Sequence, residues 1–256
     1  MLHTKMSRIL DRIILGFAAA LVLSAGSARA GEVKVAVAAN FAEAAREIGA
    51  LFEQSTGDKA VFSVASTGTL YTQITQDAPF EVFLAADRTH PQEAIDEGFA
   101  VAGSRFTYAT GRIVLFSRNK RLIKGEATLK DGHFTRIAIA NPVTAPYGAA
   151  ALAVLKKLGA YTAVESRIVQ GNNIAQTYQF VETGNAELGF VALSQVARQE
   201  DGSRWVVPEE LYPDLAQDAV LLNRGADNPA ARAFLAFLNG PEAAIVKKRF
   251  GYGSGS

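Results

Sequence analysis

Short apolar runs alternate with amphipathic segments along most of this chain. The apolar runs are rich in Val, Ile, Phe and Ala, which is typical of buried strands. The segments between them repeat apolar residues every three or four positions and mostly end at Gly, which predicts helices. Strands are predicted at residues 33–37, 60–64, 82–85, 112–117, 136–140, 167–169, 187–192, 205–207 and 218–222. Helices are predicted at residues 41–57, around 70–74, and at 91–98, 147–158, 174–183, 229–239 and 242–250. This alternation indicates an α/β protein with parallel sheets.

The predicted strands fall into two groups along the chain. The strands near Arg112 and Asp218 are short, and we expect them to cross between two lobes. Residues 31–110 together with 216–256 then form lobe I, and residues 111–215 form lobe II. Ligands of open α/β sheets bind outside the carboxyl ends of the strands, so the expected binding site is a cleft between the lobes.

Both ends of the chain are expected to lie outside the fold. Basic residues precede an apolar segment at residues 13–22, and residues 28–30 read Ala-Arg-Ala, an A-x-A cleavage site before Gly31. This is the pattern of a secretory signal peptide, so residues 1–30 are expected to direct export to a bacterial periplasm. The Gly- and Ser-rich residues 253–256 are expected to be disordered.

Composition and charge narrow the range of functions. Without residues 1–30 the chain has 22 basic and 24 acidic residues, which gives a formal charge of −2. Such a chain lacks the basic face that nucleic-acid binding requires, so no nucleic-acid partner is expected. The chain also has no Cys, which excludes disulfides, thiolate metal sites and cysteine nucleophiles.

Four junctions between a predicted strand and a predicted helix carry the candidate binding residues. Asn40 and Thr67 lie at two junctions of lobe I, and Tyr147 and Ile174 lie at two junctions of lobe II. The first N–H groups of a helix have no acceptor within it, and with the helix dipole they attract anions. Any one junction taken singly is better explained by an ordinary helix cap formed by its small polar residues. Four of them facing one cleft indicate an anion-binding site.

The groups at these junctions are neutral hydrogen-bond donors: an amide, a hydroxyl, a phenol and backbone N–H groups. A fully ionised tetrahedral oxyanion needs donors on every side, whereas hydrogen phosphate also needs an acceptor for its proton. No carboxylate stands at the four junctions. A sulfate-like dianion is therefore expected to bind in preference to hydrogen phosphate, and chromate and sulfate both remain open as ligands.

The sequence offers little support for an enzyme. His90 and His133 are far apart in the sequence and lack the spacing of a metal site. The G-x-S-x-G elbow of α/β hydrolases and the phosphate-binding G-x-x-x-x-G-K-[ST] loop are both absent from the sequence. A hydrolytic enzyme on an α/β fold is therefore a remote alternative, and a binding protein without a cofactor is expected.

Five stretches of the chain carry a resemblance to a known family. They read AVAANFAEAAREIGALFEQSTG, VFSVASTGTLYTQITQDAPFEVFLAAD, IANPVTAPYGAAALAVLKKLGA, ELGFVALSQV and FLNGPEAAIVKKRFGY. Together they span essentially the whole chain after residue 30, and they resemble the periplasmic molybdate-binding proteins of molybdate ABC transporters. The resemblance implies the two-lobed type II periplasmic binding protein fold, with a ligand cleft between the lobes. It also implies a monomer that captures molybdate, and with it tungstate, for an ABC permease in the inner membrane.

The resemblance also assigns ligand positions, which fall on Asn40, Thr67, Tyr147 and Ile174. Ile174 is implied to act through its backbone N–H, because its side chain is apolar. Secondary contacts are expected at the neighbouring positions Ala39, Ser66, Asn173 and Ala192. Some members of the family have a Tyr at the position of Ala192, whose hydroxyl completes the ligand shell. Ala192 cannot supply that hydroxyl, and we expect Tyr147 to replace it from the opposite wall.

Overall fold

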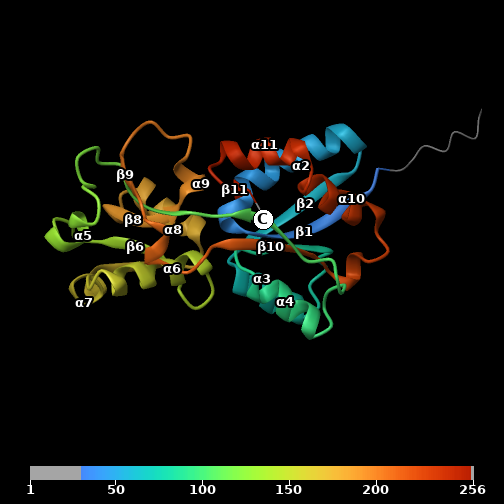
Figure 1. Cartoon of the computed structure of the whole chain (residues 1–256), viewed down its shortest axis with the longest axis horizontal. Helices are drawn as coiled ribbons and strands as arrows, with labels where there is room; N and C mark the ends of the chain where they lie inside the picture. The colour runs from blue at the N-terminus through green and yellow to red at the C-terminus, as the bar shows by residue number, and fades with distance from the viewer. Residues whose placement is uncertain (1–29, 255–256) are drawn as a thin grey trace, which may run out of the picture. The chain divides into compact units, whose positions relative to one another are not determined.

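The computed structural model of the protein describes residues 30–254. The predicted signal peptide lies outside these residues, apart from Ala30. Within them the polypeptide forms two β-sheets, each with its own helices, and Figure 1 shows the two groups of elements connected by extended segments. None of the described helices is long and apolar enough to cross a membrane.

The first sheet has six strands in the order β11-β4-β10-β3-β1-β2. Its strands are β1 (Glu32–Ala38), β2 (Lys59–Ala65), β3 (Val82–Leu84), β4 (Phe106–Thr110), β10 (Ala216–Leu221) and β11 (Gly253–Ser254). The strand β1 pairs in parallel with β2 and β3, whereas β10 runs antiparallel to β3 and β4. The sheet is therefore mixed, and the prediction of parallel sheets throughout is wrong here.

Helices cover both faces of this sheet because its strands alternate their side chains between two cores. Val33, Val35 and Val37 of β1 pack in one core, and Ala36 packs in the other. The helices of the first core are α2 (Ala42–Thr56), α10 (Pro229–Leu238) and α11 (Pro241–Arg249). Those of the second are α3 (Thr67–Thr75) and α4 (Thr89–Asp96), and Figure 1 shows α3 and α4 on the side of β10 opposite to α2 and α11.

The second sheet has five strands in the order β7-β6-β8-β5-β9. They are β5 (Ile113–Ser117), β6 (Ile137–Ala140), β7 (Ile168–Gly171), β8 (Leu188–Ala192) and β9 (Ser203–Val206). β6 pairs in parallel with β7 and β8, but β5 is antiparallel to β8 and β9, so this sheet is also mixed. Its helices are α5 (Ala127–Asp131), α6 (Pro146–Lys157), α7 (Tyr161–Val164), α8 (Ile174–Glu182) and α9 (Leu193–Val196).

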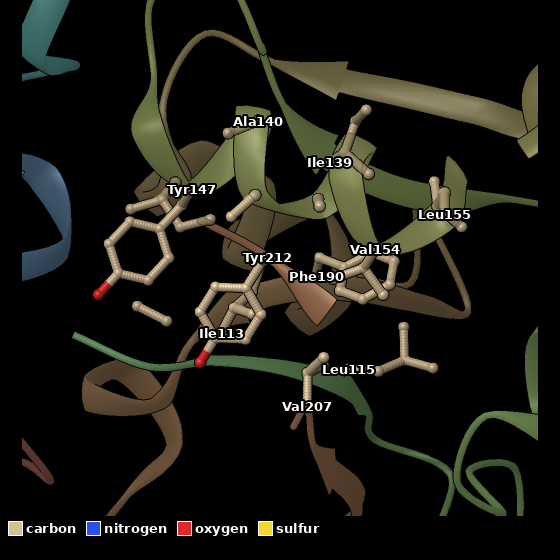
Figure 2. Packing of buried hydrophobic residues seen from close by; sticks show 14 of the residues in the cluster. Ile113, Leu115, Ile139, Ala140, Tyr147, Val154, Leu155, Phe190, Val207 and Tyr212 are labelled. Atoms are coloured by element: carbon tan, nitrogen blue, oxygen red, sulfur yellow. The ribbon is translucent and has the colours of Figure 1, made fainter. Parts of the chain in front are cut away.

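The helix α6 packs on one face of the second sheet. Ala150, Ala151, Val154 and Leu155 of α6 share a buried cluster with inward-facing residues of β5, β6 and β8. Figure 2 shows this packing, with Val154 and Leu155 among the aliphatic side chains and Tyr147 at the edge of the group, its hydroxyl pointing away from Leu155. The start of α6 is thereby fixed at the end of β6, where the candidate site lies.

Two extended segments connect the sheets. One runs from β4 into β5, and the other from β9 through the short 3-10 helix η4 (Glu209–Leu211) into β10. They are hydrogen-bonded to each other where they pass, because the Gly111 N–H donates to the Leu215 carbonyl over 2.9 Å. The candidate hinge is therefore a pair of hydrogen-bonded segments rather than a loose linker.

Most predicted elements are present, with ends shifted by one to three residues. The strand β4 is missing from the sequence-based prediction. The predicted disorder of the C-terminal tail is wrong at Gly253 and Ser254, which pair as β11 with Thr110 and Ala109 of β4. Residues 255 and 256 lie outside the described part of the chain.

Candidate functional site

All four residues predicted to bind the ligand line one small cavity. They lie at the starts of the 3-10 helix η2 (Ala39–Phe41) and of α3, α6 and α8. We call the starts of η2 and α3 the first wall, and the starts of α6 and α8 the second wall. The residues lining the cavity are Ala38, Ala39, Asn40, Ser66, Thr67, Ala86, Ala145, Pro146, Tyr147 and Ile174.

None of these lining residues carries a charge. Larger hollows occur elsewhere, including one beside His90, but Asp87 and Asp214 line that hollow. Carboxylates repel an anion, so the smaller cavity with neutral donors suits an oxyanion better despite its size. Burial raises the pKa of the Tyr147 hydroxyl well above its ordinary value, so this group stays protonated and can donate.

At the start of α8 the chain leaves one N–H group free. The Asn173 side chain caps the helix, and its Oδ1 accepts from the N–H groups of Ala175 and Gln176, each over 3.0 Å. Within residues 30–254 the N–H of Ile174 makes no hydrogen bond. Ile174 is buried, so that N–H is the group it can offer to a ligand in the cavity.

At the start of α6 one N–H group also lacks an acceptor among the described residues, although no side chain caps this helix. Ala145 occupies the N-cap position, and Pro146, the first residue of the helix, has no N–H group. The N–H groups of Gly148 and Ala149 both donate to the Ala145 carbonyl, over 2.8 Å and 3.1 Å. In the described part of the chain this leaves the N–H of Tyr147 without an acceptor.

At the start of α3 the first wall contacts the second. The Gly68 N–H donates to the Thr144 carbonyl over 2.9 Å, while the N–H of Thr67 has no acceptor among the described residues. The Thr67 hydroxyl accepts from the Ala86 N–H over 2.9 Å and keeps its own proton for another acceptor. Thr67 therefore presents two donors, one from the backbone and one from the side chain.

The side chain of Asn40 does not cap a helix, which was the alternative explanation for its junction. The caps of η2 and α2 are Ala38 and Phe41, and neither is formed by a side chain. The Asn40 Nδ2 donates instead to Gln217 Oε1 over 2.8 Å and to the Tyr252 hydroxyl over 3.2 Å. Both amide hydrogens point into the protein, so the side chain of Asn40 braces the first wall.

The secondary positions divide into two pairs. Ala39 and Ser66 line the cavity, whereas Asn173 and Ala192 do not. Asn173 is occupied in capping α8, and the Ala192 N–H donates to Gln195 Oε1 over 2.9 Å. The same Gln195 donates to the Ile174 carbonyl over 3.0 Å, so Ala192 helps to support α8 from outside the cavity.

A buried polar cluster behind the cavity is absent from the sequence-based prediction. Its members are Gln217, Tyr108, Tyr252 and Ser194. The hydroxyls of Tyr252 and Ser194 both donate to the Asn40 carbonyl, over 2.7 Å and 2.9 Å. The sequence does hold one signal for this cluster, since Gln217 and Asp218 interrupt an otherwise apolar strand, and both are buried.

Comparison with known proteins identifies the family. Residues 33–253 match the family model described as "Bacterial extracellular solute-binding protein". The Molybdate-binding protein ModA of Rhodobacter capsulatus is 51% identical over 225 residues, which are 88% of this chain and 89% of that protein. The protein of the same name from Azotobacter vinelandii is 52% identical over 252 residues, 97% of this chain and 99% of that protein. The solved structure of an Azotobacter vinelandii periplasmic molybdate-binding protein matches with a TM-score of 0.84 and 36% identity, over 88% of this chain and all of that one.

These matches confirm the predicted two-lobed α/β fold and the predicted family resemblance. The relatives are binding proteins, which confirms the prediction that the chain is not an enzyme. The chain belongs to the bacterial extracellular solute-binding proteins and, among them, to the ModA molybdate-binding proteins.

Proposed function

We propose that this chain binds molybdate, and with it tungstate, in the cavity between the two walls. The observation that carries the proposal is that the N–H groups of Thr67, Tyr147 and Ile174, which have no acceptor within residues 30–254, converge on one uncharged cavity. Asn40 lines the cavity from the start of η2. The Thr67 and Tyr147 hydroxyls supply two further donors. The names of the relatives support molybdate as the anion.

The donor set is sufficient for tight binding. A hydrogen bond to a charged group contributes about 1.5–3 kcal/mol. Five or six of them, less the cost of closing the lobes, reach the roughly 8–12 kcal/mol that corresponds to micromolar to nanomolar affinity. No net positive charge is needed, since oriented N–H groups supply the attraction locally.

The proposed mechanism is closure of lobe I (residues 31–110 and 216–256) against lobe II (residues 111–215). In support, β1 to β4 with β10 and β11 form one sheet, and β5 to β9 form the other. Hydrogen bonds between the lobes, such as Gly68 N–H to the Thr144 carbonyl and Ser194 Oγ to the Asn40 carbonyl, are available to the closed form. An anion that bonds to both walls stabilises that form and shifts the population towards it.

The proposal extends to the cellular role. We propose that residues 1–30 export the chain to the periplasm, where it acts as a monomer and delivers its anion to an ABC permease in the inner membrane. No cofactor takes part, because the anion is the cargo.

The test uses the full chain, expressed in a bacterium and purified from the periplasmic fraction. An N-terminal sequence beginning at Gly31 is the expected sign of export. Isothermal titration with molybdate, tungstate, chromate, sulfate and phosphate at one pH and salt concentration then measures selectivity. Submicromolar binding of molybdate and tungstate, with sulfate and phosphate at least about a hundredfold weaker, is expected. If sulfate or chromate binds more tightly than molybdate, that anion takes the place of molybdate as the proposed ligand. If none of the five anions binds, the proposal is overturned.

A further inference from the structure

Gln217 lies behind the cavity, and its side chain is bonded to residues of both walls. It is fully buried in β10, two residues after Leu215, whose carbonyl takes part in the contact between the two connecting segments. Its Oε1 accepts from Asn40 Nδ2 over 2.8 Å, and its Nε2 donates to the Tyr147 hydroxyl over 3.3 Å. One amide therefore spans from the first wall to the second, next to the candidate hinge.

We propose that Gln217 is a positioning residue for the anion: by donating to the Tyr147 hydroxyl, it keeps the proton of that hydroxyl available to the bound oxyanion. The inference rests on the proposed function, because it assumes that the cavity holds an oxyanion. Gln217 itself does not line the cavity, so its influence on the ligand passes through Tyr147 and Asn40.

Counting protons at Tyr147 supports this role. A phenol has one hydrogen to donate and can also accept. The Tyr147 oxygen accepts from Gln217, and within residues 30–254 its own hydrogen has no acceptor. Burial holds the pKa of this phenol well above its ordinary value, so the hydrogen is retained at neutral pH. A hydroxyl that is fixed as an acceptor on one side is ready to donate on the other.

The orientation of the Gln217 amide is set by Asn40. Oε1 accepts from Asn40 Nδ2 over 2.8 Å. The Tyr108 hydroxyl lies 3.0 Å from Oε1 and also 3.0 Å from the Ala85 carbonyl, so the two oxygens compete for its single hydrogen. Asn40 Nδ2 is in turn held by the Tyr252 hydroxyl. These contacts leave the Nε2 group of Gln217 to face Tyr147.

The backbone is shaped to allow this contact. A Cβ atom at Gly111 would lie 2.1 Å from the Tyr147 hydroxyl and 2.4 Å from Gln217 Nε2. No side chain other than hydrogen fits there without separating the two groups. A glycine at this point of the connecting segment is what lets the phenol and the amide meet.

A reversed hydrogen-bond pattern makes the opposite prediction. If both amides were turned over, Gln217 would donate to Asn40 and accept from Tyr147. The Tyr147 proton would then be used inside the protein, and Asn40 Nδ2 would no longer be bonded to Gln217. In that case removing the Tyr147 hydroxyl would not weaken anion binding directly.

The test is a double-mutant cycle measured by isothermal titration with sodium molybdate. Tyr147→Phe is expected to weaken binding about tenfold, and Gln217→Met at least as much, because Met also removes the acceptor of Asn40 Nδ2. The double variant is expected to bind no more weakly than Gln217→Met alone, because Tyr147 has no donor function left to lose once Gln217 is gone. Thermal unfolding of every variant separates loss of affinity from loss of stability.

Tyr212→Phe is the matched control. Tyr212 lies in the same buried cluster as Tyr147, but its hydroxyl has no hydrogen-bond partner among the described residues. Its removal is expected to leave the affinity for molybdate within about twofold. A larger effect there would show that buried phenols matter here through packing alone, and would overturn the inference.

Two results of the cycle would also overturn it. Losses that multiply in the double variant would mean that Gln217 and Tyr147 act independently, and an unchanged affinity of Tyr147→Phe would favour the reversed pattern. If Gln217→Met does not fold, Gln217→Glu takes its place, since it has the same size and keeps the acceptor for Asn40. Tyr147→Phe should then cost less in that background than in the wild type. Failure of the wild type itself to bind molybdate would count against the proposed function, which the cycle alone does not test.

Discussion

The starts of η2 and α8 contribute to one cavity by opposite means. At η2 the side chain of Asn40 is bonded to Gln217 and Tyr252, so residue identity matters and the contacts reach far along the chain. At α8 the side chain of Ile174 offers no polar group. Its N–H has no acceptor among the described residues, because Asn173 accepts from the N–H groups of Ala175 and Gln176 instead. One junction depends on a buried side-chain cluster, and the other depends on backbone geometry alone.

This difference has a consequence for substitutions. Changes at η2 should disturb the hinge, the first wall and the fold together, because Asn40 is linked to β10 and to the C-terminal segment. Changes at α8 should be tolerated as long as the helix start keeps its shape. The site as a whole then combines one sensitive wall with one robust wall.

The largest effect is expected from Asn40→Leu, which replaces the amide by an apolar group of similar shape. The change removes the hydrogen bonds from Asn40 Nδ2 to Gln217 Oε1 and to the Tyr252 hydroxyl. Each buried hydrogen bond contributes about 0.5–1.5 kcal/mol. We expect a loss of about 1–3 kcal/mol in unfolding free energy, measured by urea denaturation, and at least about a hundredfold in molybdate affinity. Asn185→Leu, at an exposed position, is the control, and an Asn40 variant with wild-type affinity would contradict the comparison.

A smaller effect is expected from Thr67→Val, which keeps the shape of the side chain but removes the hydroxyl. The Ala86 N–H loses its acceptor, and the cavity loses a donor. We expect molybdate affinity to fall by about 1–3 kcal/mol in titration. Thr128→Val is a matched control, because its buried hydroxyl also accepts a backbone N–H, from Lys124, far from the cavity. Equal losses of affinity in the two variants would remove Thr67 from the site.

The sequence predicts the elements that depend on local patterns, and it misses those that depend on contacts with distant parts of the chain. The helices and most strands are predictable because their signals are local: apolar periodicity within the element and Gly at its end. The strand β4 reads FTYAT, in which polar and apolar residues mix without a clear period. The strand β11 consists of two residues that gain their order from pairing with β4, so nothing in their own sequence announces it.

The candidate site shows the same limit. Asn40, Thr67, Tyr147 and Ile174 are predictable because each marks a junction between a strand and a helix, which is a local pattern. The cluster behind them is not, since Gln217 and Tyr252 lie 177 and 212 residues from Asn40 in the sequence. Contacts over such distances depend on the path of the chain through both connecting segments, which no local pattern encodes.

A third test removes the cap that shapes the robust wall. In Asn173→Ala the N–H groups of Ala175 and Gln176 lose their acceptor. We expect about 1 kcal/mol of lost stability, as for other capping residues, and a loss of molybdate affinity of no more than about tenfold. Asn228→Ala removes the corresponding cap of α10 and should leave the affinity unchanged. If Asn173→Ala abolished binding, the second wall would be as sensitive as the first.

A fourth test changes the one residue whose side chain should not matter. In Ile174→Val the backbone N–H stays in place, while one buried methylene is lost. A decrease of about 0.5–1.5 kcal/mol in unfolding free energy is expected from the small cavity. Titration should give a molybdate affinity within about twofold of the wild type, and a tenfold loss would mean that the side chain itself contributes to the ligand site.

The smallest effect should come from pH, because none of the residues that line the cavity is an acid or a base that titrates near neutrality. The only phenol among them is Tyr147, and burial raises its pKa well above the ordinary value of about 10. Raising the pKa of a phenol extends its neutral, donating form to higher pH, so the donor is lost only above that range. Molybdate affinity should therefore be constant from about pH 7 to about pH 9.5 in titrations at fixed ionic strength. A decline within that interval would place a titrating group in contact with the anion, and would make the chemistry of the cavity different from the uncharged donor set on which both walls depend.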